Sequence, residues 1–148
     1  MVSTDVVLDA GFSGDLYFEN INFDGTGRDR IINHKGGVMQ ISKISIINCV
    51  IAGFNAGIYY DNSADQLDLG EFVIEGCDIH GILGSGGDGF DVRNASTIGK
   101  ITFRNNTVFD GFRSFFRIDD KSTSLEEMVF ENNTVKNIAV TMPALTPC

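Results

Sequence analysis

The feature that most constrains the fold of this chain is a short phrase that occurs five times at nearly equal spacing. Each copy has apolar residues at its first and third positions, and successive copies begin 28, 28, 29 and 27 residues apart. The copies are Leu16–Asn20, Ile44–Asn48, Phe72–Gly76, Ile101–Asn105 and Met128–Asn132. Self-similarity at a period of roughly 20 to 50 residues is typical of stacked repeats. The period of two inside the phrase predicts a strand.

The remainder of each unit supplies two more strand signals. In the last four units an apolar residue lies three positions before the phrase, separated from it by polar or glycine residues, which predicts a corner between two short strands; these residues are Ile41, Leu69, Ile98 and Leu125. After the phrase come an apolar position, a turn, and a second strand whose inward residues we expect to be Ile31, Ile58, Tyr60, Phe90, Val92, Phe116 and Ile118. A unit of about 28 residues therefore holds three short strands and three turns, and no helical period is present.

Equivalent strands of successive units must lie side by side and parallel, which a chain without helices achieves only by coiling. We therefore predict an all-β fold, a right-handed parallel β-helix of about five rungs, roughly 24 Å long at about 4.8 Å per rung. Residues 1–148 form one domain in this interpretation.

One polar residue type repeats at the end of the phrase. It is an Asn in four units and Gly76 in the third, and the four are Asn20, Asn48, Asn105 and Asn132. An Asn at a repeated bend can bond its own turn and the amide of the next layer, so we expect a structural Asn ladder. Ligand contact is the alternative.

The first two cysteines follow this column by one residue. Cys49 and Cys77 then occupy adjacent layers and either pair or pack; in-register parallel neighbours suit a disulfide poorly, which favours two buried thiols. Cys148 is the remaining cysteine, and three cysteines without a close pair indicate no zinc site.

The net charge of −9 argues against a sequence-independent grip on nucleic acid, because that grip requires Lys and Arg at the phosphates. No stretch of roughly 18 to 20 apolar residues predicts membrane insertion, and no signal peptide is recognised at the start of the chain.

Two units carry a wider phrase, apolar-x-apolar-x-Asn-Asn-Thr, at Ile101–Val108 and Met128–Val135. On these residues the chain resembles the pectin-lyase-like superfamily of right-handed parallel β-helices over about residues 14–138. Within it, the chain is most similar to chondroitinase-B-like and uncharacterised β-helix domains of bacterial polysaccharide-utilisation proteins. The resemblance implies a carbohydrate context and an extracellular or periplasmic location. The lyases of that group hold calcium beside a catalytic Lys and Arg, and no matching set is found here, so no catalytic residue is carried over.

The outward positions of the second strand form the candidate binding surface. We expect one column of Ile32, Tyr59, Asp91 and Arg117, and a second of His34, Asp61, Arg93 and Asp119. The aromatic ring and guanidinium groups suit a sugar ring and its acidic substituents, with His34 or Tyr59 as the base if the chain is a lyase. Cross-strand ion pairing is the competing interpretation of the same charges.

The third unit has extra residues, Leu83–Asp88, before its second strand. The run Gly86–Asp91 matches the opening of a calcium-binding nonapeptide repeat, so Asp88 and Asp91 are candidate calcium ligands. The motif occurs once where tandem copies are needed, and a plain glycine-rich loop is the alternative.

The ends of the coil offer little to cap it. Residues 139–148 hold both prolines, which blunt a strand edge. We therefore expect either a segment of a longer solenoid or association end to end or side to side. Three functions remain open: a non-catalytic scaffold or carbohydrate-binding module, a lyase or glycosidase fragment acting on an acidic polysaccharide, and a self-associating adhesin segment.

Overall fold

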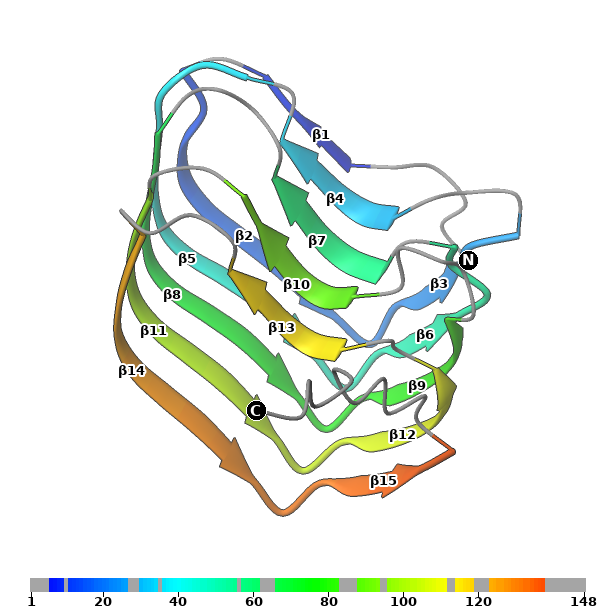
Figure 1. Ribbon diagram of the computed structural model, residues 1–148. Helices are drawn as coiled ribbons and strands as arrows, with labels where there is room; N and C mark the ends of the chain where they lie inside the picture. Colours follow the sequence, from blue (N-terminus) through cyan, green and yellow to red (C-terminus); the bar gives the residue numbers. More distant parts are fainter. Residues whose placement is uncertain are drawn as a thin grey trace, which may run out of the picture.

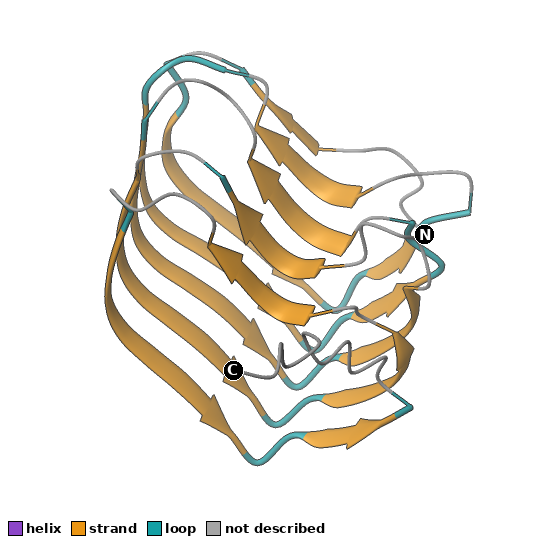
Figure 2. Cartoon of the chain, in the orientation of Figure 1, coloured by secondary structure: helices purple, strands orange, loops and turns teal. Residues whose placement is uncertain are grey.

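Each repeat of the sequence forms one turn of a coil, and each turn contributes one strand to each of three parallel sheets (Figure 1). The computed structural model describes residues 6–9, 11–26, 30–34, 36–55, 57–61, 66–82, 88–93, 96–111, 114–118 and 123–137. All regular structure in these residues is strand (Figure 2), and none of them forms a helix of the length and apolar character needed to cross a membrane. The predicted all-β parallel coil with three strands per rung is confirmed.

The three sheets differ in strand length. The long-strand sheet contains β2 (Ser13–Glu19), β5 (Met39–Ile47), β8 (Leu67–Glu75), β11 (Ser96–Arg104) and β14 (Ser124–Glu131). The second sheet contains β3 (Asn22–Asp24), β6 (Val50–Ala52), β9 (Asp78–Ile82), β12 (Thr107–Gly111) and β15 (Thr134–Lys136). The third sheet contains β1 (Val6–Leu8), β4 (Arg30–His34), β7 (Gly57–Asp61), β10 (Asp88–Val92) and β13 (Ser114–Ile118).

The corner predicted ahead of the phrase is a bend inside one long strand. Pairing between β5 and β8 continues from Ile41 and Leu69 to Lys43 and Glu71, and only the position of Gly70 is passed over. A Cβ on Gly70 would lie 2.5 Å from the carbonyl oxygen of Ser42, so the bend brings the backbones together there. The three strands of a rung are therefore divided differently from the prediction, because the short apolar segment after the phrase is a strand of its own.

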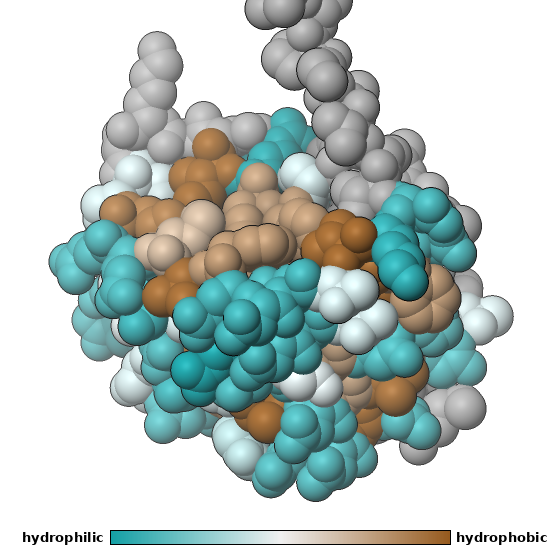
Figure 3. Space-filling model, turned by 90° about the horizontal axis from the view of Figure 1, so that it is seen from below, coloured by the Kyte–Doolittle hydropathy of each residue, from teal (hydrophilic) through white to brown (hydrophobic). Residues whose placement is uncertain are grey.

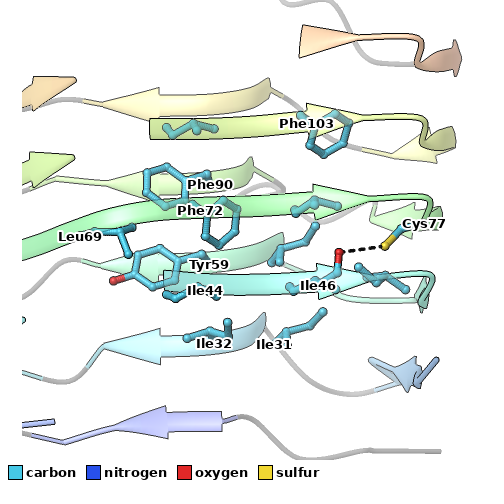
Figure 4. Close-up of a cluster of buried hydrophobic side chains, with 14 of the residues drawn as sticks. Ile31, Ile32, Ile44, Ile46, Tyr59, Leu69, Phe72, Cys77, Phe90 and Phe103 are labelled. Atoms are coloured by element: carbon cyan, nitrogen blue, oxygen red, sulfur yellow. Dashed lines mark hydrogen bonds between the residues drawn. The ribbon is translucent and has the colours of Figure 1, made fainter. Parts of the chain in front are cut away.

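The core fills the coil between the three sheets (Figure 4). Its centre is aromatic: the rings of Tyr59 and Phe90 stack with centroids 5.0 Å apart, and Phe72 lies 4.7 Å from Phe90. The predicted columns of the phrase are buried in the three central units, where Ile44 and Ile46 are fully shielded from solvent, but Met128 and Phe130 of the last unit are exposed. Burial of this kind is worth about 1.5 to 3 kcal/mol for each large apolar side chain.

The turn between the long-strand sheet and the second sheet is where the predicted Asn ladder needs correction. The residues of that column are exposed and hold left-handed backbone angles, with φ of 56° at Asn20, 50° at Asn48, 56° at Asn105 and 53° at Asn132. Asn and Gly are the residues that tolerate this conformation best, which explains why Gly76 (φ 64°) replaces Asn in the third unit. The residues of this column are therefore selected for the left-handed backbone angle of the turn. The ladder of hydrogen-bonded side chains is formed by the residues that follow them by one position.

That ladder, which we call the turn ladder, consists of Cys49, Cys77, Asn106 and Asn133. The backbone N–H of each layer donates to the side chain of the next: Cys49 N to Cys77 Sγ at 3.4 Å, Cys77 N to Asn106 Oδ1 at 2.9 Å, and Asn106 N to Asn133 Oδ1 at 3.0 Å. The side chains also donate inward, as when Cys77 Sγ bonds the carbonyl of Ile46 (Figure 4) and Asn106 Nδ2 that of Ile74. The cysteines are free and buried, which confirms the prediction for them.

Candidate functional site

The charged flank of the third sheet is an ion-paired surface. Asp91 is 1% exposed, and Arg93 donates to both of its carboxylate oxygens at 2.7 to 3.1 Å. Asp88 is fully buried, accepts a hydrogen bond from the Ser114 hydroxyl at 2.8 Å and lies 3.9 Å from an Arg117 nitrogen. Ion pairs therefore occur on this flank: Arg93 pairs with Asp91 of its own segment, whereas the Arg117–Asp88 contact joins adjacent strands. A binding role for these residues stays a prediction.

Three members of the predicted surface, Ile32, Tyr59 and His34, lie inside the coil, and Ile32 is fully buried. Tyr59 is 1% exposed and pairs in register with Ile32 and Phe90, so the expectation that it offers its ring to a ligand is wrong. His34 is also buried, with Nε2 2.9 Å from the carbonyl of Gly37, and is not a surface base. The physical reason is that the run Ile58-Tyr59-Tyr60 has no period of two, so its register could not be read.

Other predicted positions fall partly or wholly outside the described residues. These are Asp119, the side chain of Asp61, residues 83–87 of the extra loop, and Cys148. Among the described residues, no cluster of three metal-ligating side chains occurs, and the two calcium candidates, Asp88 and Asp91, face Ser114, Arg93 and Arg117. Calcium binding there stays a prediction.

A groove on the outer face of the long-strand sheet is the strongest candidate site in the described part of the chain. It encloses about 840 Å³ and crosses the strands, so that it runs along the axis of the coil. Its lining comes from all five strands: Asp15, Leu16, Tyr17, Lys43, Ser45, Ile47, Glu71, Val73, Glu75, Lys100, Thr102, Arg104, Val129 and Glu131.

The walls of the groove are two rows of side chains, one on each side, and all of these residues except Ile47 are charged. One row is Asp15, Lys43, Glu71, Lys100 and Glu127, and the other is Glu19, Ile47, Glu75, Arg104 and Glu131. Lys43 pairs with Glu71 at 2.7 Å, Lys100 with Glu127 at 3.1 Å, and Arg104 with Glu75 at 2.8 Å. These pairs are solvated, so each stabilises the fold by no more than about 1 kcal/mol. They offer charged donors and acceptors to a ligand.

The floor of the groove is narrow and almost fully shielded. Ser45, Val73 and Thr102 are 2%, 5% and 5% exposed although they lie on the outer face of the sheet, because the two rows of long side chains cover them. The hydroxyl of Thr102 is buried with no hydrogen-bond partner, and so is Nε of Arg104. A buried polar atom without a protein partner is unusual, and a water molecule or a ligand hydroxyl can supply the missing bond.

The β2 end of the groove carries its aromatic residue. Tyr17 is 63% exposed, in the same column as Ser45 and the other floor residues. A hydrogen bond to Glu19 raises the pKa of the Tyr17 hydroxyl above its ordinary value, with smaller contributions from burial and charge. The phenol is therefore held in its neutral form, which makes it a poor base and leaves its ring as a contact surface.

The sequence analysis missed this site because it placed the candidate binding surface on the second strand and not on the outward residues of the phrase. The signal was present: the outer residues alternate in charge between successive units, acidic in the first, third and fifth and basic in the second and fourth. What the sequence does not contain is the burial of Ser45 and Thr102, which depends on how the flanking side chains close over them.

Comparisons with known proteins found one family. The model of the family described as Domain of unknown function (DUF4957) matches residues 4–111, which ends at the last residue of β12. No curated protein and no solved structure matches the chain.

Proposed function

Since the chain belongs to the DUF4957 family, which is defined by sequence, we propose its function from the groove: a non-catalytic β-helix module that binds a neutral oligosaccharide. The observation that carries this proposal is the buried, unpartnered Thr102 hydroxyl at the floor of an open groove. A sugar hydroxyl both donates and accepts, so it can satisfy Thr102 Oγ1 while neighbouring hydroxyls bond the charged walls. The exposed ring of Tyr17 supplies an apolar face for a pyranose ring.

The charges of the groove favour a neutral glycan over an acidic one. Its lining holds four carboxylates, from Asp15, Glu71, Glu75 and Glu131, against three cations. Each of the three cations already pairs with a carboxylate within 3.1 Å. A polyanionic chain would have to displace these carboxylates and would also be repelled by the net charge of −9.

The same arrangement argues for binding without chemistry. A lyase needs a base near an acidic sugar proton and a cation that stabilises the resulting anion. The Tyr17 pKa is shifted away from that of a useful base, and the groove cations are neutralised by their partners. The proposal includes an extracellular or periplasmic location and a relation to the pectin-lyase-like superfamily, both supported by the Asn-Asn-Thr phrases.

The test is a binding panel of neutral and uronic-acid polysaccharides, measured by calorimetry, with absorbance of the unsaturated lyase product recorded in parallel. We expect binding to at least one neutral polysaccharide and no product. Tyr17→Ala should weaken that binding about twofold to tenfold, since a ring contact is worth about 0.5 to 1.5 kcal/mol.

The matched control is Phe109→Ala. Phe109 lies on the outer face of the second sheet, where it stacks on His80 at 4.8 Å, away from the groove lining. We expect its removal to leave glycan affinity unchanged. Formation of unsaturated product would show that the chain is an enzyme and not a non-catalytic module. Equal losses of glycan affinity in the Tyr17→Ala and Phe109→Ala variants, or no binding across the panel, would show that the groove is not the binding site.

A further inference from the structure

The strands of the long-strand sheet alternate in charge from one rung to the next. The central segments are Asp15–Glu19, Lys43–Ile47, Glu71–Glu75, Lys100–Arg104 and Glu127–Glu131, and paired residues of these segments lie directly beside one another. The first, third and fifth segments begin and end on a carboxylate, whereas the second and fourth begin on Lys. Each acidic strand therefore prefers a basic neighbour, and opposite charges on adjacent strands contribute about 0.2 to 1 kcal/mol per pair.

Strand β11 shows what an acidic strand of this sheet binds. It carries Lys100 and Arg104 four residues apart, with two apolar residues and Thr102 between them. Its Arg104 pairs with Glu75 of β8 on one side, and its Lys100 pairs with Glu127 of β14 on the other. Strand β11 thus forms an ion pair with an acidic strand at each of its two edges.

Strand β14 has the same pattern as β8 but has a described neighbour on one side only. Both run Glu, apolar, Val, apolar, Glu, and β14 is the terminal strand of its sheet in the described part of the chain. Its inward residues Met128 and Phe130 are 45% and 47% exposed, and Val135 of the same rung is 39% exposed. Figure 3, seen from this end, shows apolar side chains gathered together and bordered by hydrophilic ones. An open strand edge over exposed apolar residues is a ready surface for strand addition.

We propose that the edge of β14 that has no neighbour among the described residues binds a parallel strand of a partner protein with the pattern basic, apolar, hydroxyl, apolar, basic. Such a strand places its two cations beside Glu127 and Glu131 and its two apolar side chains over Met128 and Phe130, as β11 does on β8. The turn ladder adds a requirement, because each of its layers donates a backbone N–H to the next. If the partner strand has an Asn two positions after its second cation, the side-chain oxygen of that Asn would accept a hydrogen bond from the backbone N–H of Asn133. The side chain of Asn133 accepts from the backbone N–H of Asn106 in the same way.

A second copy of this chain does not fit the same edge at neutral pH. Continuing the coil with another copy would place β2 beside β14, with Asp15 next to Glu127 and Glu19 next to Glu131. Like charges directly opposite each other on adjacent strands are destabilising. The acidic first and last described strands of this sheet, β2 and β14, therefore oppose the end-to-end association expected from the sequence, whereas a basic strand beside β14 meets no such repulsion.

The test uses the full chain and a labelled peptide of residues 96–108, which carries the required pattern at Lys100–Arg104 and an Asn at position 106. Fluorescence anisotropy at low salt should show binding at least tenfold tighter than that of the same peptide with Lys100→Glu and Arg104→Glu. In the protein, Glu127→Lys with Glu131→Lys should reverse this preference.

Two controls place the site and exclude self-association as its cause. Asp15→Lys with Glu19→Lys makes the same charge change at the opposite end and should leave peptide binding at β14 unchanged. In sedimentation velocity, the wild-type chain should be monomeric, and the Glu127→Lys/Glu131→Lys variant should associate head to tail. Equal binding of both peptides, an unchanged preference in the β14 variant, or wild-type head-to-tail oligomers would each overturn the proposal.

Discussion

The turn ladder and the outer groove are both built from side chains that repeat layer by layer, yet they differ in whether the chain satisfies them. In the turn ladder, Asn106 donates to the carbonyl of Ile74 and accepts from Cys77 N. In the groove, Thr102 lies only four residues earlier in the same chain, and its buried hydroxyl has no partner. A repeated polar residue therefore indicates structure where its hydrogen bonds close within the coil.

The charged flank of the third sheet belongs with the turn ladder by this criterion. Its carboxylates are buried, and Arg93 and Ser114 donate hydrogen bonds to them. The groove differs because its ion pairs are solvated and the buried hydroxyl of Thr102 has no hydrogen-bond partner within the protein. Hydrogen-bond satisfaction, and not the presence of charge, separates the two kinds of surface.

The largest effect is expected from breaking the turn ladder. Asn106→Ala removes the acceptor of the buried Cys77 N–H and the donor to the Ile74 carbonyl. Because both groups stay buried without partners, we expect a loss of about 2 to 3 kcal/mol in the free energy of unfolding, measured by urea titration.

The neighbouring residue provides the control for this change. Asn105 is exposed with φ of 56°, so Asn105→Gly keeps the conformation and removes no bond of the ladder. Its effect should be within about 0.5 kcal/mol. If the two variants lose equal stability, the distinction between the conformational column and the turn ladder is wrong.

These two adjacent residues also show how far the sequence alone could lead. The period of 28 residues predicted the parallel coil, its three strands per rung and the buried cysteines. It did not predict which Asn of the pair Asn105-Asn106 turns inward. Both residues are the same type, and the choice depends on the left-handed angle that rotates the following side chain into the core.

The candidate site was less accessible to prediction for a related reason. Tyr59 and Tyr60 are chemically alike, so their pattern could not show that the Tyr59 ring enters the core, and the predicted binding surface included this buried residue. The shape of the groove depends on how far the side chains of five units, which the coil brings together, extend from the face of the sheet. Sequence spacing gives their register, whereas the shielding of Thr102 follows only from packing.

A smaller effect is expected from raising the pH. Burial raises the pKa of the Cys77 thiol to about 12, whereas an unfolded thiol ionises near pH 8.5. Above pH 8.5 the unfolded chain loses a proton that the folded chain keeps, so the free energy of unfolding should fall with rising pH up to about pH 12. The slope from this group is about 1.4 kcal/mol per pH unit, measurable by urea titrations between pH 8 and pH 10.

Cys77→Asn isolates this contribution from other groups that titrate in alkali. Asn occupies the same layer position in the next two units and bonds both of its neighbours there, so the variant should keep the turn ladder. Its stability should depend less steeply on pH than that of the wild-type chain. Identical slopes would show that the Cys77 thiol does not titrate on unfolding in this range.

Apart from the control variants, the smallest change in the free energy of unfolding is expected for Thr102→Val, and whether it is a gain or a loss distinguishes an unpartnered hydroxyl from a hydroxyl satisfied within the fold. Thr102→Val replaces a buried hydroxyl without a partner by a methyl group, and Val already fills the adjacent positions of the same column at Val73 and Val129. We expect the free energy of unfolding to rise by about 1 kcal/mol, equivalent to a melting temperature about 2 to 4 °C higher. Glycan affinity should fall at the same time, because the ligand loses the hydrogen bond that this hydroxyl offers.

Ser45→Ala in the same column is the control. The Ser45 hydroxyl is not a buried polar group without a partner, so its removal should not raise the free energy of unfolding. If Thr102→Val gains stability without losing glycan affinity, the unpartnered hydroxyl is a packing defect and not part of a binding site. If Thr102→Val loses stability, the Thr102 hydroxyl is hydrogen-bonded within the fold, as the Asn106 side chain is.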